Sequence, residues 1–276
     1  MTRNIDKNTV QGFGDEWSAF DHSDVSTEAF DEIFSDYFSI MPENIFDGKS
    51  VGFDFGCGSG RWARLIAPKV GKLHCIDASE KALSVARSGL SKQTNCAFHH
   101  STSDELPLED ASCDFGFSLG VLHHIPSTKD AMKECVKKLK PGAPFLVYLY
   151  YAFDNKPFWF KFIWKMSELA RFALSKMPFP LRFVFSQIIA VLVYFPLSKT
   201  AAFCHKLGVD TKNFPLNYYR DKPFYVQRTD ALDRFGTRLE QRFSRQEIAN
   251  MMNYCGLDNI KFSDKMPYWC AVGIKK

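Results

Sequence analysis

The chain has 276 residues, of which 46% are hydrophobic and 15% aromatic, and a formal net charge of +4. This length allows one large domain, or one domain that carries a large insertion, with apolar residues enough for a core. The mild charge gives no argument for nucleic-acid binding, so we expect no nucleic-acid partner. The first residues lack the apolar segment of a secretion signal, so we expect a cytoplasmic protein.

Eight cysteines are scattered along the chain without any C-x-x-C pair. Three of them, Cys57, Cys75 and Cys113, lie in or beside apolar stretches that read as core strands. Buried free thiols in a reducing compartment account for this pattern better than disulfides or zinc, so we expect neither a disulfide nor a metal site.

The N-terminal segment, residues 1–45, is predicted to be helical up to Ile40. Its apolar side chains recur at helical spacing and form one stripe, made of Ala29, Phe30, Ile33, Phe34 and Phe38.

From position 50 onward, short apolar runs alternate with helical patterns. We expect strands over residues 50–55, 73–76, 96–99, 114–118 and 144–151, and helices over residues 61–67, 79–90 and 127–139. Such alternation predicts a parallel, doubly wound α/β sheet.

After residue 151 the alternation stops, and residues 154–240 are predicted to be a helical insertion. Ser244 and Glu247 then form a capping box for a helix that ends near Tyr254. Two last strands, over residues 259–262 and 268–274, are expected to form an antiparallel pair, which completes a single domain over residues 1–276.

The first predicted strand breaks into a glycine-rich turn. Asp54 precedes Gly56, Gly58 and Gly60, and the next apolar run ends on Asp77. Glycines let the backbone turn sharply and approach a ligand closely, because they carry no Cβ. A strand, a glycine turn, a helix, a strand and then a carboxylate is a nucleoside-binding layout.

The glycine spacing narrows the choice of nucleoside. The dinucleotide pattern G-x-G-x-x-G, started at Gly56, needs a glycine at the position of Arg61. A carboxylate at Asp54 would repel a pyrophosphate but attract an ammonium or a sulfonium. This stretch resembles class I S-adenosylmethionine-dependent methyltransferases of the methyltransferase type 11, UbiE-like group. An NAD(P)-dependent oxidoreductase is the alternative that Arg61 and Asp54 disfavour.

The resemblance implies a Rossmann-like, seven-stranded sheet, mostly parallel with the last strand antiparallel, and S-adenosylmethionine as the cofactor. It places the methionine part of the cofactor at the glycine loop, the ribose at Asp77 and the adenine near Ala78. Relatives usually carry an acid where Thr102 stands, so the hydroxyl of Thr102 and the backbone of Ser103 would bind the adenine less strongly. The implied cofactor-binding residues are Phe13, Trp17, Asp54, Gly56, Cys57, Gly58, Gly60, Asp77, Ala78, Thr102, Ser103, Leu119 and Gly120.

Several of these residues have a second interpretation. Phe13 or Trp17 offers an aromatic face to the sulfonium if the N-terminal segment closes over the cofactor, or it simply packs on the sheet. Cys57 is more typical of a small packing residue than of a nucleophile. His123 and His124 follow the fourth strand, where a methyl acceptor would arrive, so either is a candidate general base. The alternative is one core histidine and one solvated histidine.

The sequence lacks the motifs of some methyltransferase subclasses. Ser118-Leu-Gly-Val121 stands where amino-methylating DNA enzymes carry [DN]-P-P-[FY], and no Pro-Cys dipeptide is present for cytosine chemistry. A small-molecule methyl acceptor, hydrophobic or acidic, is therefore expected, with the accepting atom and the oligomeric state left open.

The insertion allows two interpretations. Its apolar run over residues 183–195 is too short to span a bilayer, which needs roughly 20 residues. A helical lid over the acceptor pocket is favoured, while a basic, aromatic surface over residues 156–206 that rests on an anionic membrane is the alternative. A non-catalytic, membrane-surface binding protein of the same fold is a third hypothesis for the chain.

A charged stretch follows, over residues 218–242, and resembles a solvated loop. Its position before the last helix also makes it a candidate for acceptor recognition, because arginine forks bind carboxylates and phosphates. The candidate substrate-binding residues are Tyr151, Tyr219, Arg220, Arg228, Asp230 and Arg234.

Overall fold

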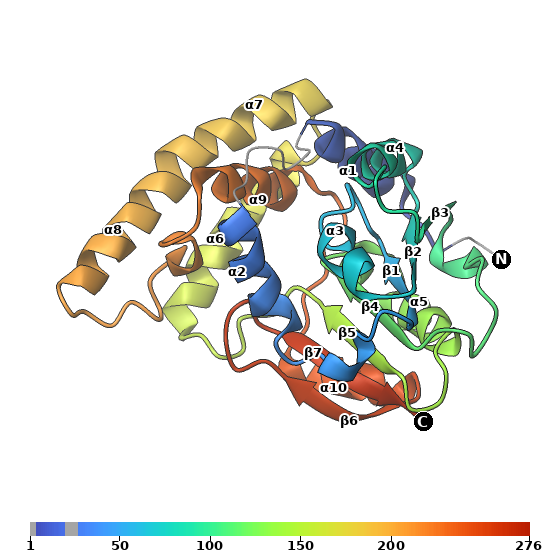
Figure 1. Cartoon of the computed structure of the whole chain (residues 1–276). Coiled ribbons are helices and arrows are strands. Elements are labelled where there is room, and N and C mark those ends of the chain that lie inside the picture. The colour runs from blue at the N-terminus through green and yellow to red at the C-terminus, as the bar shows by residue number, and fades with distance from the viewer. Residues whose placement is uncertain (1–3, 20–26) are drawn as a thin grey trace. The chain divides into compact units, whose positions relative to one another are not determined.

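The computed structural model describes residues 4–19 and 27–276, and the side chains of these residues outside 16–32. The chain divides into two compact units (Figure 1). Unit 1 comprises residues 1–21, 32–152 and 239–276, and unit 2 comprises residues 22–31 and 153–238.

Unit 1 is built on a seven-stranded sheet with the order β3-β2-β1-β4-β5-β7-β6. Neighbouring strands are parallel except where β7 pairs with β5 and β6, and both of those pairings are antiparallel. The predicted doubly wound, mostly parallel sheet is therefore confirmed. The strands are β1 (Val51–Phe55), β2 (Lys72–Asp77), β3 (Cys96–His100), β4 (Phe115–Leu119), β5 (Pro144–Tyr148), β6 (Leu257–Phe262) and β7 (Cys270–Lys275).

Two glycine–phenylalanine pairs lock β1 against β4. Gly52 faces Phe115 in the register, and Phe53 faces Gly116. A Cβ at Gly52 would lie 2.1 Å from the ring of Phe115, and one at Gly116 would lie 2.3 Å from the ring of Phe53. Each glycine thus makes room for a buried ring on the neighbouring strand, and this packing holds the two strands whose ends form the site.

The helices of unit 1 are α1 (Lys7–Ala19), α3 (Ala63–Ile66), α4 (Glu80–Gly89), α5 (Thr128–Lys137) and α10 (Arg245–Tyr254). Three of them begin after a serine whose side chain caps the helix. Ser79 and Ser127 accept hydrogen bonds from the backbone N–H of Ala82 and Asp130, and Ser244 forms the predicted capping box with Glu247.

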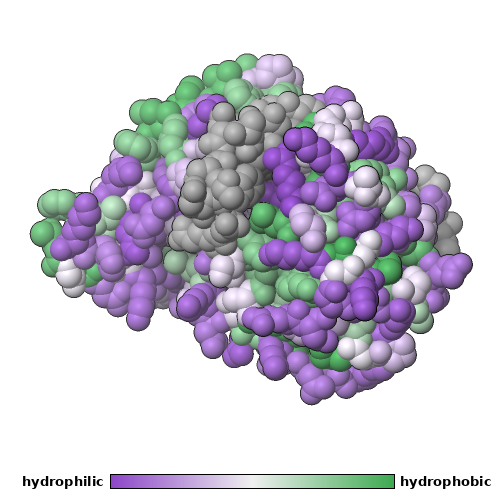
Figure 2. Space-filling view, viewed as in Figure 1, coloured by the Kyte–Doolittle hydropathy of each residue, from purple (hydrophilic) through white to green (hydrophobic). Residues whose placement is uncertain are grey.

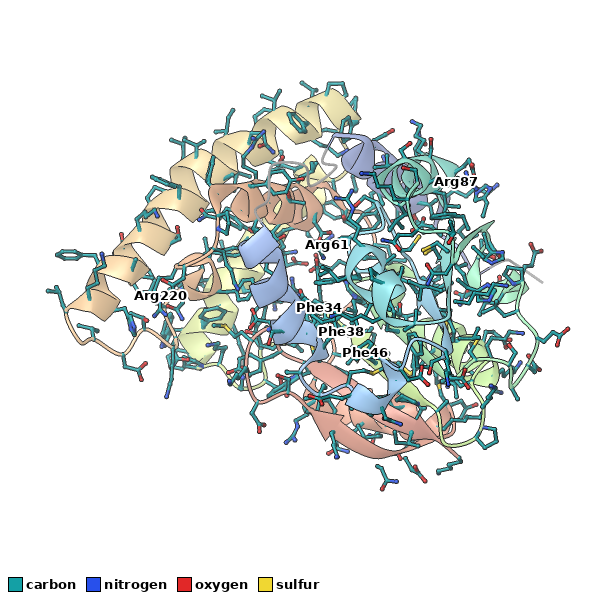
Figure 3. All side chains as sticks on the ribbon, in the orientation of Figure 1. Phe34, Phe38, Phe46, Arg61, Arg87 and Arg220 are labelled. Carbon is teal, nitrogen blue, oxygen red and sulfur yellow. The ribbon has the colours of Figure 1, made fainter. Side chains whose placement is uncertain are left out.

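Helix α2 (Thr27–Phe38) is described for its side chains from Ile33 onward. Phe34 and Phe38 stack with ring centroids 4.4 Å apart, and Figure 3 shows both on this helix. Phe38 is buried and meets the ring of Phe117 on β4 edge-on. The second half of the predicted apolar stripe is confirmed, while the side chains of Ala29 and Phe30 lie outside the described residues.

Unit 2 consists of helices. They are α6 (Phe158–Leu174), α7 (Phe179–Ile189), the π-helical turn η5 (Ala190–Tyr194), α8 (Phe195–Lys206), the short helix η6 (Asn217–Tyr219) and α9 (Phe224–Gly236). The helical insertion is thus observed, and the expectation of a solvated loop over residues 218–242 is wrong for the part that forms α9. Most of the buried residues of α9 are apolar or small, which gives the charged stretch a packed side.

The apolar run of the insertion is longer as a helix than the sequence predicted. Elements α7, η5 and α8 join into one helix over Phe179–Lys206, 28 residues with a mean hydropathy of 1.7 in its most apolar part. Pro196 does not stop this helix, because the π-helical turn Ala190–Tyr194 just before it changes the backbone hydrogen-bond pattern that a proline in a regular helix interior would break. The estimate of a run too short to span a bilayer is therefore wrong: this helix is long and apolar enough by length and composition.

Candidate functional site

A pocket opens in unit 1 at the carboxyl ends of β1, β2 and β4, the edge where parallel sheets of this kind bind ligands. Figure 3 labels Arg61, which comes from the loop after β1 and borders this pocket. The lining residues are Asn4, Ile5, Asp6, Thr9, Val10, Phe13, Phe55, Gly56, Cys57, Gly58, Ser59, Arg61, Trp62, Asp77, Ala78, Thr102, Ser103, Leu119, Gly120, Val121, His124 and Ile125.

The glycine loop is held in a shape that only glycine adopts easily. Gly56 has a φ of +80°, and its N–H donates to the carbonyl of Ile76 at 2.7 Å. A Cβ at Gly56 would lie 2.3 Å from a methyl carbon of Val121. Gly60 is also left-handed but faces Ala86 and Leu90 instead of the pocket. Gly56 and Gly58 therefore line the pocket, whereas Gly60, which was predicted to bind the cofactor with them, does not and serves the packing of the loop on α4.

Asp77 closes the loop from the end of β2. One carboxylate oxygen accepts from the N–H of Gly58 at 2.9 Å, and the other accepts from the N–H of Ser79 at 2.8 Å. Burial raises the pKa of this carboxyl above its usual range, although both backbone donors oppose that shift. Each oxygen accepts one of these bonds, which leaves acceptor capacity on the pocket side for hydroxyl groups of a ligand.

Asp54 lies beneath the loop and is only 1% exposed. Neither of its carboxylate oxygens has a hydrogen-bond partner among the described residues. Burial and the nearby charge of Asp77 raise its pKa well above the usual range. The predicted direct contact is corrected in one respect, because Asp54 does not line the pocket. A buried, unpaired carboxyl is costly, and a cationic ligand above the loop is what would offset that cost.

The remaining predicted contacts surround the loop. Leu119 and Gly120 line the pocket from the end of β4, and Ala78 lines it from the end of β2. The side-chain oxygens of Thr102 and Ser103 are buried and have no partner among the described residues. The two hydroxyls are thus available to a ligand, including the one that stands in the place of the usual acid.

Cys57 lines the pocket but is a poor nucleophile. A hydrogen bond with Cys75 favours its thiolate, yet burial and the charges of Asp77 and Asp54 raise the pKa of the Cys57 thiol to about 11. It is therefore a neutral thiol at physiological pH, as a packing residue would be. All eight cysteines, each within the described ranges, are free thiols.

The start of the chain contributes residues that the sequence analysis missed. Two hydrogen bonds join the side chain of Asn4 to the backbone of Ser127. The side-chain N–H of Asn4 donates to the carbonyl of Ser127 at 2.9 Å, and its side-chain oxygen accepts from the N–H of Ser127 at 2.7 Å. Asp6 caps α1 by accepting from the N–H of Thr9. This Asp-x-x-Thr spacing was the available signal for a helix start. Phe13 lines the pocket as predicted, whereas the side chain of Trp17 lies outside the described residues.

The two histidines have different surroundings. His124 lines the pocket, and its Nδ1 lies 2.6 Å from the carbonyl oxygen of Leu239. Because a carbonyl only accepts, Nδ1 carries the proton in the neutral ring and Nε2 is the basic nitrogen. His123 is fully buried and does not line the pocket. Its ring stacks on the ring of Tyr150, with 3.9 Å between the ring centroids. Burial and the charges of His124 and Arg242 lower the pKa of His123 well below its usual value.

The residues of unit 2 that were predicted to recognise the acceptor form hydrogen bonds and ion pairs with other residues of unit 2. Tyr219 donates to Asp230 at 2.9 Å, Arg228 bonds Gln187, and Arg234 pairs with Glu168. Arg220, labelled in Figure 3, pairs with the neighbouring Asp221. These contacts give the five residues a structural role, and their role toward an acceptor stays a prediction.

Tyr151 belongs to unit 1 and also does not line the pocket. Strand β5 ends at Tyr148, and Tyr151 forms a single bridge with Phe243 instead of extending the strand. Its ring packs against Tyr268 and Trp269 beside the core of the sheet.

The residues of the pocket fit S-adenosylmethionine. Buried, unpaired carboxylate oxygens at Asp54 suit a cation, the acceptor capacity of Asp77 suits a ribose, and the glycine at position 56 keeps the loop open. No group of three or more histidine, cysteine or acidic side chains that could hold a metal ion was found over the ranges 4–19 and 27–276.

Comparison with known proteins agrees with this fit. Residues 53–147 match the family model described as a methyltransferase domain. Phosphoethanolamine N-methyltransferase 2 of Caenorhabditis elegans is 35% identical over 100 residues, which are 35% of this chain and 23% of that protein. A ubiquinone biosynthesis O-methyltransferase of Idiomarina loihiensis is 35% identical over 100 residues, 34% of this chain and 40% of that protein. The matched segments thus span less than half the length of these curated relatives.

Solved structures share the fold. One chain of a complex between a methyltransferase activator and a methyltransferase of Haloferax volcanii is similar with a TM-score of 0.53 and 15% identity, covering 94% of this chain and 97% of that one. A protein of Bordetella parapertussis is similar with a TM-score of 0.51 and 13% identity, covering 88% of this chain and 67% of that one. These likenesses show the fold, and the matched segment shows that residues 53–147 belong to a methyltransferase domain of the class I S-adenosylmethionine-dependent family.

Proposed function

We propose that the protein transfers a methyl group from S-adenosylmethionine to a small-molecule acceptor. The observation that carries this proposal is the pair of carboxyls at the glycine loop, the buried Asp54 and the partly buried Asp77. Neither forms an ion pair with a lysine or arginine of the described residues, so both are suited to a ligand that brings its own positive charge and hydroxyls.

Different side chains around the loop would bind different parts of the cofactor. Asp77 would accept hydrogen bonds from the ribose, while the hydroxyls of Thr102 and Ser103 would meet the adenine. Asp54 would stabilise the cationic end of the cofactor from beneath the loop. S-adenosylmethionine, when bound, supplies an electrophilic methyl group on a good leaving group. The protein then mainly has to align the acceptor and exclude water.

We assign the acceptor to the part of the pocket lined by the apolar side chains of Phe13, Leu119, Val121 and Ile125. His124 also lines the pocket. This composition favours an apolar acceptor with one reactive polar group. Two relatives are named ubiquinone biosynthesis O-methyltransferase and demethylmenaquinone methyltransferase, and we propose a quinone-type acceptor for this chain on that ground.

His124 is the proposed general base for an acceptor that must lose a proton. Its Nδ1–H is held by the carbonyl of Leu239, so its basic nitrogen is Nε2. Removing a proton from a hydroxyl as the bond to the methyl group forms contributes about 10²–10⁴-fold to a rate. His123, which does not line the pocket, is not part of this proposal.

The first test is calorimetric titration with S-adenosylhomocysteine, with NADH as the control ligand. Micromolar binding of S-adenosylhomocysteine alone is expected. Binding of NADH alone would establish the oxidoreductase alternative instead and overturn the assignment of the glycine loop.

The second test separates His124 from its neighbour. His124→Asn keeps an N–H that can reach the carbonyl of Leu239 but removes the basic nitrogen. With a quinol precursor as the trial acceptor, kcat should fall about 100-fold or more while the Kd of S-adenosylhomocysteine stays unchanged. His123→Asn is the matched control. Equal rates for the wild type and His124→Asn would remove the base from the mechanism.

We also propose a cytoplasmic location with peripheral membrane contact through residues 156–206. Support comes from the exposed aromatic side chains of this region, which include Phe158, Phe162 and Phe172. A membrane would be the natural store of an apolar acceptor.

A further inference from the structure

The long helix of unit 2 turns its small side chains inward and its large apolar side chains outward. Its buried positions recur every three or four residues, and they are Ser186, Ala190, Tyr194, Ser198 and Ala201. Its exposed large apolar side chains are Leu181, Val184, Phe185, Ile188, Val191, Leu192, Val193, Phe195 and Phe203. A helix of a water-soluble core has the opposite arrangement, while helices that face lipid pack through small residues.

Helix α6 repeats this arrangement. It has no buried residue, and the side chains of Phe158, Phe162, Met166, Leu169 and Phe172 are between 53% and 84% exposed. Figure 2 shows hydrophobic atoms gathered along the outer side of α7. An exposed apolar surface of this extent marks an interaction site, since water-soluble surfaces rarely keep one.

The same region is strongly basic. Residues 156–206 contain eight lysines and arginines against one acid, Glu168, a net charge of +7. Because the whole chain carries +4, the rest of it carries −3. The ammonium group of Lys176 lies 3.4 Å from the centre of the Phe172 ring, and that of Lys199 lies 5.5 Å from the Phe195 ring. Cations beside exposed rings are placed as at a lipid headgroup layer, with the stems on apolar surface and the charges outward.

The positive charge of this surface favours a lipid bilayer over a second copy of this chain as its partner. A symmetric contact between two such surfaces would bring the lysines of one copy against those of the other, and like charges in an interface are unfavourable. An anionic lipid surface attracts juxtamembrane lysines and arginines instead, by about 1 kcal/mol each.

The inner side of the helix argues against crossing the bilayer. Gln187 accepts a hydrogen bond from Arg228, Arg182 donates to the carbonyl of Gly236, and Ser198 donates to Gln227. All three partners lie on α9, which also carries Asp230, Asp233 and Arg234. A spanning helix would carry these charges into the hydrocarbon or lose its contacts with α9, and either is costly.

We propose that unit 2 is a monotopic membrane element, in which α6 and the helix 179–206 lie in the headgroup layer of an anionic bilayer. The apolar faces enter the acyl boundary, and the lysines meet anionic headgroups. This specifies the peripheral contact proposed above, and it does not depend on which acceptor is methylated.

The test is flotation of the purified protein with phosphatidylcholine vesicles, with and without phosphatidylglycerol, at low and high salt. We expect binding that requires phosphatidylglycerol, weakens with salt and is released by alkaline carbonate. The double variant Phe172→Gln/Leu192→Gln should bind about tenfold or more weakly, because two apolar side chains lose their burial in lipid. Tyr254→Gln, which removes an equally exposed ring on α10 of unit 1, is the matched control and should bind as the wild type does.

Several results would overturn the proposal. These are no binding to either vesicle, equal binding by the wild type and the double variant, or retention after carbonate, which would mark a spanning helix. A dimer in solution that the double variant dissociates would assign the surface to a second copy. Titration with S-adenosylhomocysteine, run on every variant, reports the cofactor site separately, so failure of membrane binding is distinguishable from failure of the proposed activity.

Discussion

The two units treat acidic side chains in opposite ways. In unit 1, Asp54 is 1% exposed and has no hydrogen-bond partner among the described residues. In unit 2, the side chain of Glu168 is 28% exposed, accepts from Arg171 and pairs with Arg234, and although partial burial opposes the shift, these hydrogen bonds lower the pKa of its carboxyl. A carboxyl that the fold leaves unpaired is suited to a ligand, whereas a carboxyl that the fold pairs serves architecture.

Apolar side chains show a second contrast. Unit 1 buries its large rings completely, among them Phe53, Phe115, Phe117 and Phe145. Unit 2 exposes many of its own and buries serine and alanine on the inner face of its long helix. The two units are therefore suited to different surroundings: unit 1 to water and a polar ligand, unit 2 to an apolar partner.

The largest effect is expected at Asp77. Asp77→Ala removes the acceptors for the ribose and for the N–H groups of Gly58 and Ser79. Affinity for S-adenosylhomocysteine should fall about 100-fold or more, since hydrogen bonds to a charged group contribute about 1.5–3 kcal/mol each. Calorimetric titration measures this loss, and circular dichroism checks that the fold is kept.

Asp258→Ala is the control for Asp77, because Asp258 is an acid of the same unit at the far edge of the sheet. An unchanged affinity in Asp77→Ala would refute the ribose assignment and, with it, the view that unpaired carboxyls of unit 1 await a ligand.

Gly56→Ala should destabilise unit 1 by about 2–3 kcal/mol. The φ of +80° is unfavourable for alanine, and the new Cβ would lie 2.3 Å from a methyl carbon of Val121. Thermal unfolding measures the change. The double variant is Gly56→Ala/Val121→Gly, because an alanine at position 121 would keep a Cβ 2.8 Å from the new one. In it the collision is removed but the backbone strain stays, so about half of the stability should return. Full recovery in the double variant would show that contact, and not conformation, requires the glycine.

A substitution at Arg234 tests whether the ion pair with Glu168 stabilises unit 2. Arg234→Met keeps the stem but removes the charge that pairs with Glu168 and the bond to Ser167. Unit 2 should lose about 1–2 kcal/mol, because Arg171 still pairs with the carboxylate. Faster hydrogen exchange in α9 is the readout.

Arg220→Met is the matched control for Arg234, because its partner Asp221 is largely exposed and such a pair contributes little. Unchanged exchange in Arg234→Met, together with a higher KM for the acceptor, would instead support the prediction of acceptor recognition.

Local chemistry made much of unit 1 predictable. The glycine loop, Asp77 and the serine caps each depend on neighbours within a few positions, and the alternation of strands and helices dictates a doubly wound sheet. The packing role of Gly60 was harder to predict from the sequence, because Gly60 faces Ala86 and Leu90, which come from a different element. Asn4 was missed for the same reason, since its partner Ser127 lies 123 positions away.

Unit 2 was harder to predict because its patterns conflict. Pro196 reads as a helix stop, yet the π-helical turn before it carries the helix on for 28 residues in all. The charges around Arg228 and Arg234 resemble a solvated loop, because the sequence does not show that Gln187 and Glu168 would pair with them. Pairing at long range decides both outcomes, and composition alone carries no information about it.

The smallest effect, and the most direct check on Asp54, is a proton count. Burial and the charge of Asp77 raise the pKa of Asp54 above its usual value of 3.8, so the free protein holds a proton to higher pH than the unfolded chain does. The contribution of Asp54 to the stability of the free protein is therefore full below about pH 4 and is lost as the pH rises through the raised pKa. The ammonium group that S-adenosylmethionine shares with S-adenosylhomocysteine favours the ionised carboxylate, so binding of either should release a proton and strengthen as the pH rises. Titrating S-adenosylhomocysteine in two buffers of different ionisation enthalpy counts that proton.

Asp54→Asn should release fewer protons, bind more weakly and melt no lower than the wild type without ligand. If Asp54→Asn released as many protons as the wild type, the unpaired carboxyl of unit 1 would not be the group that binding titrates.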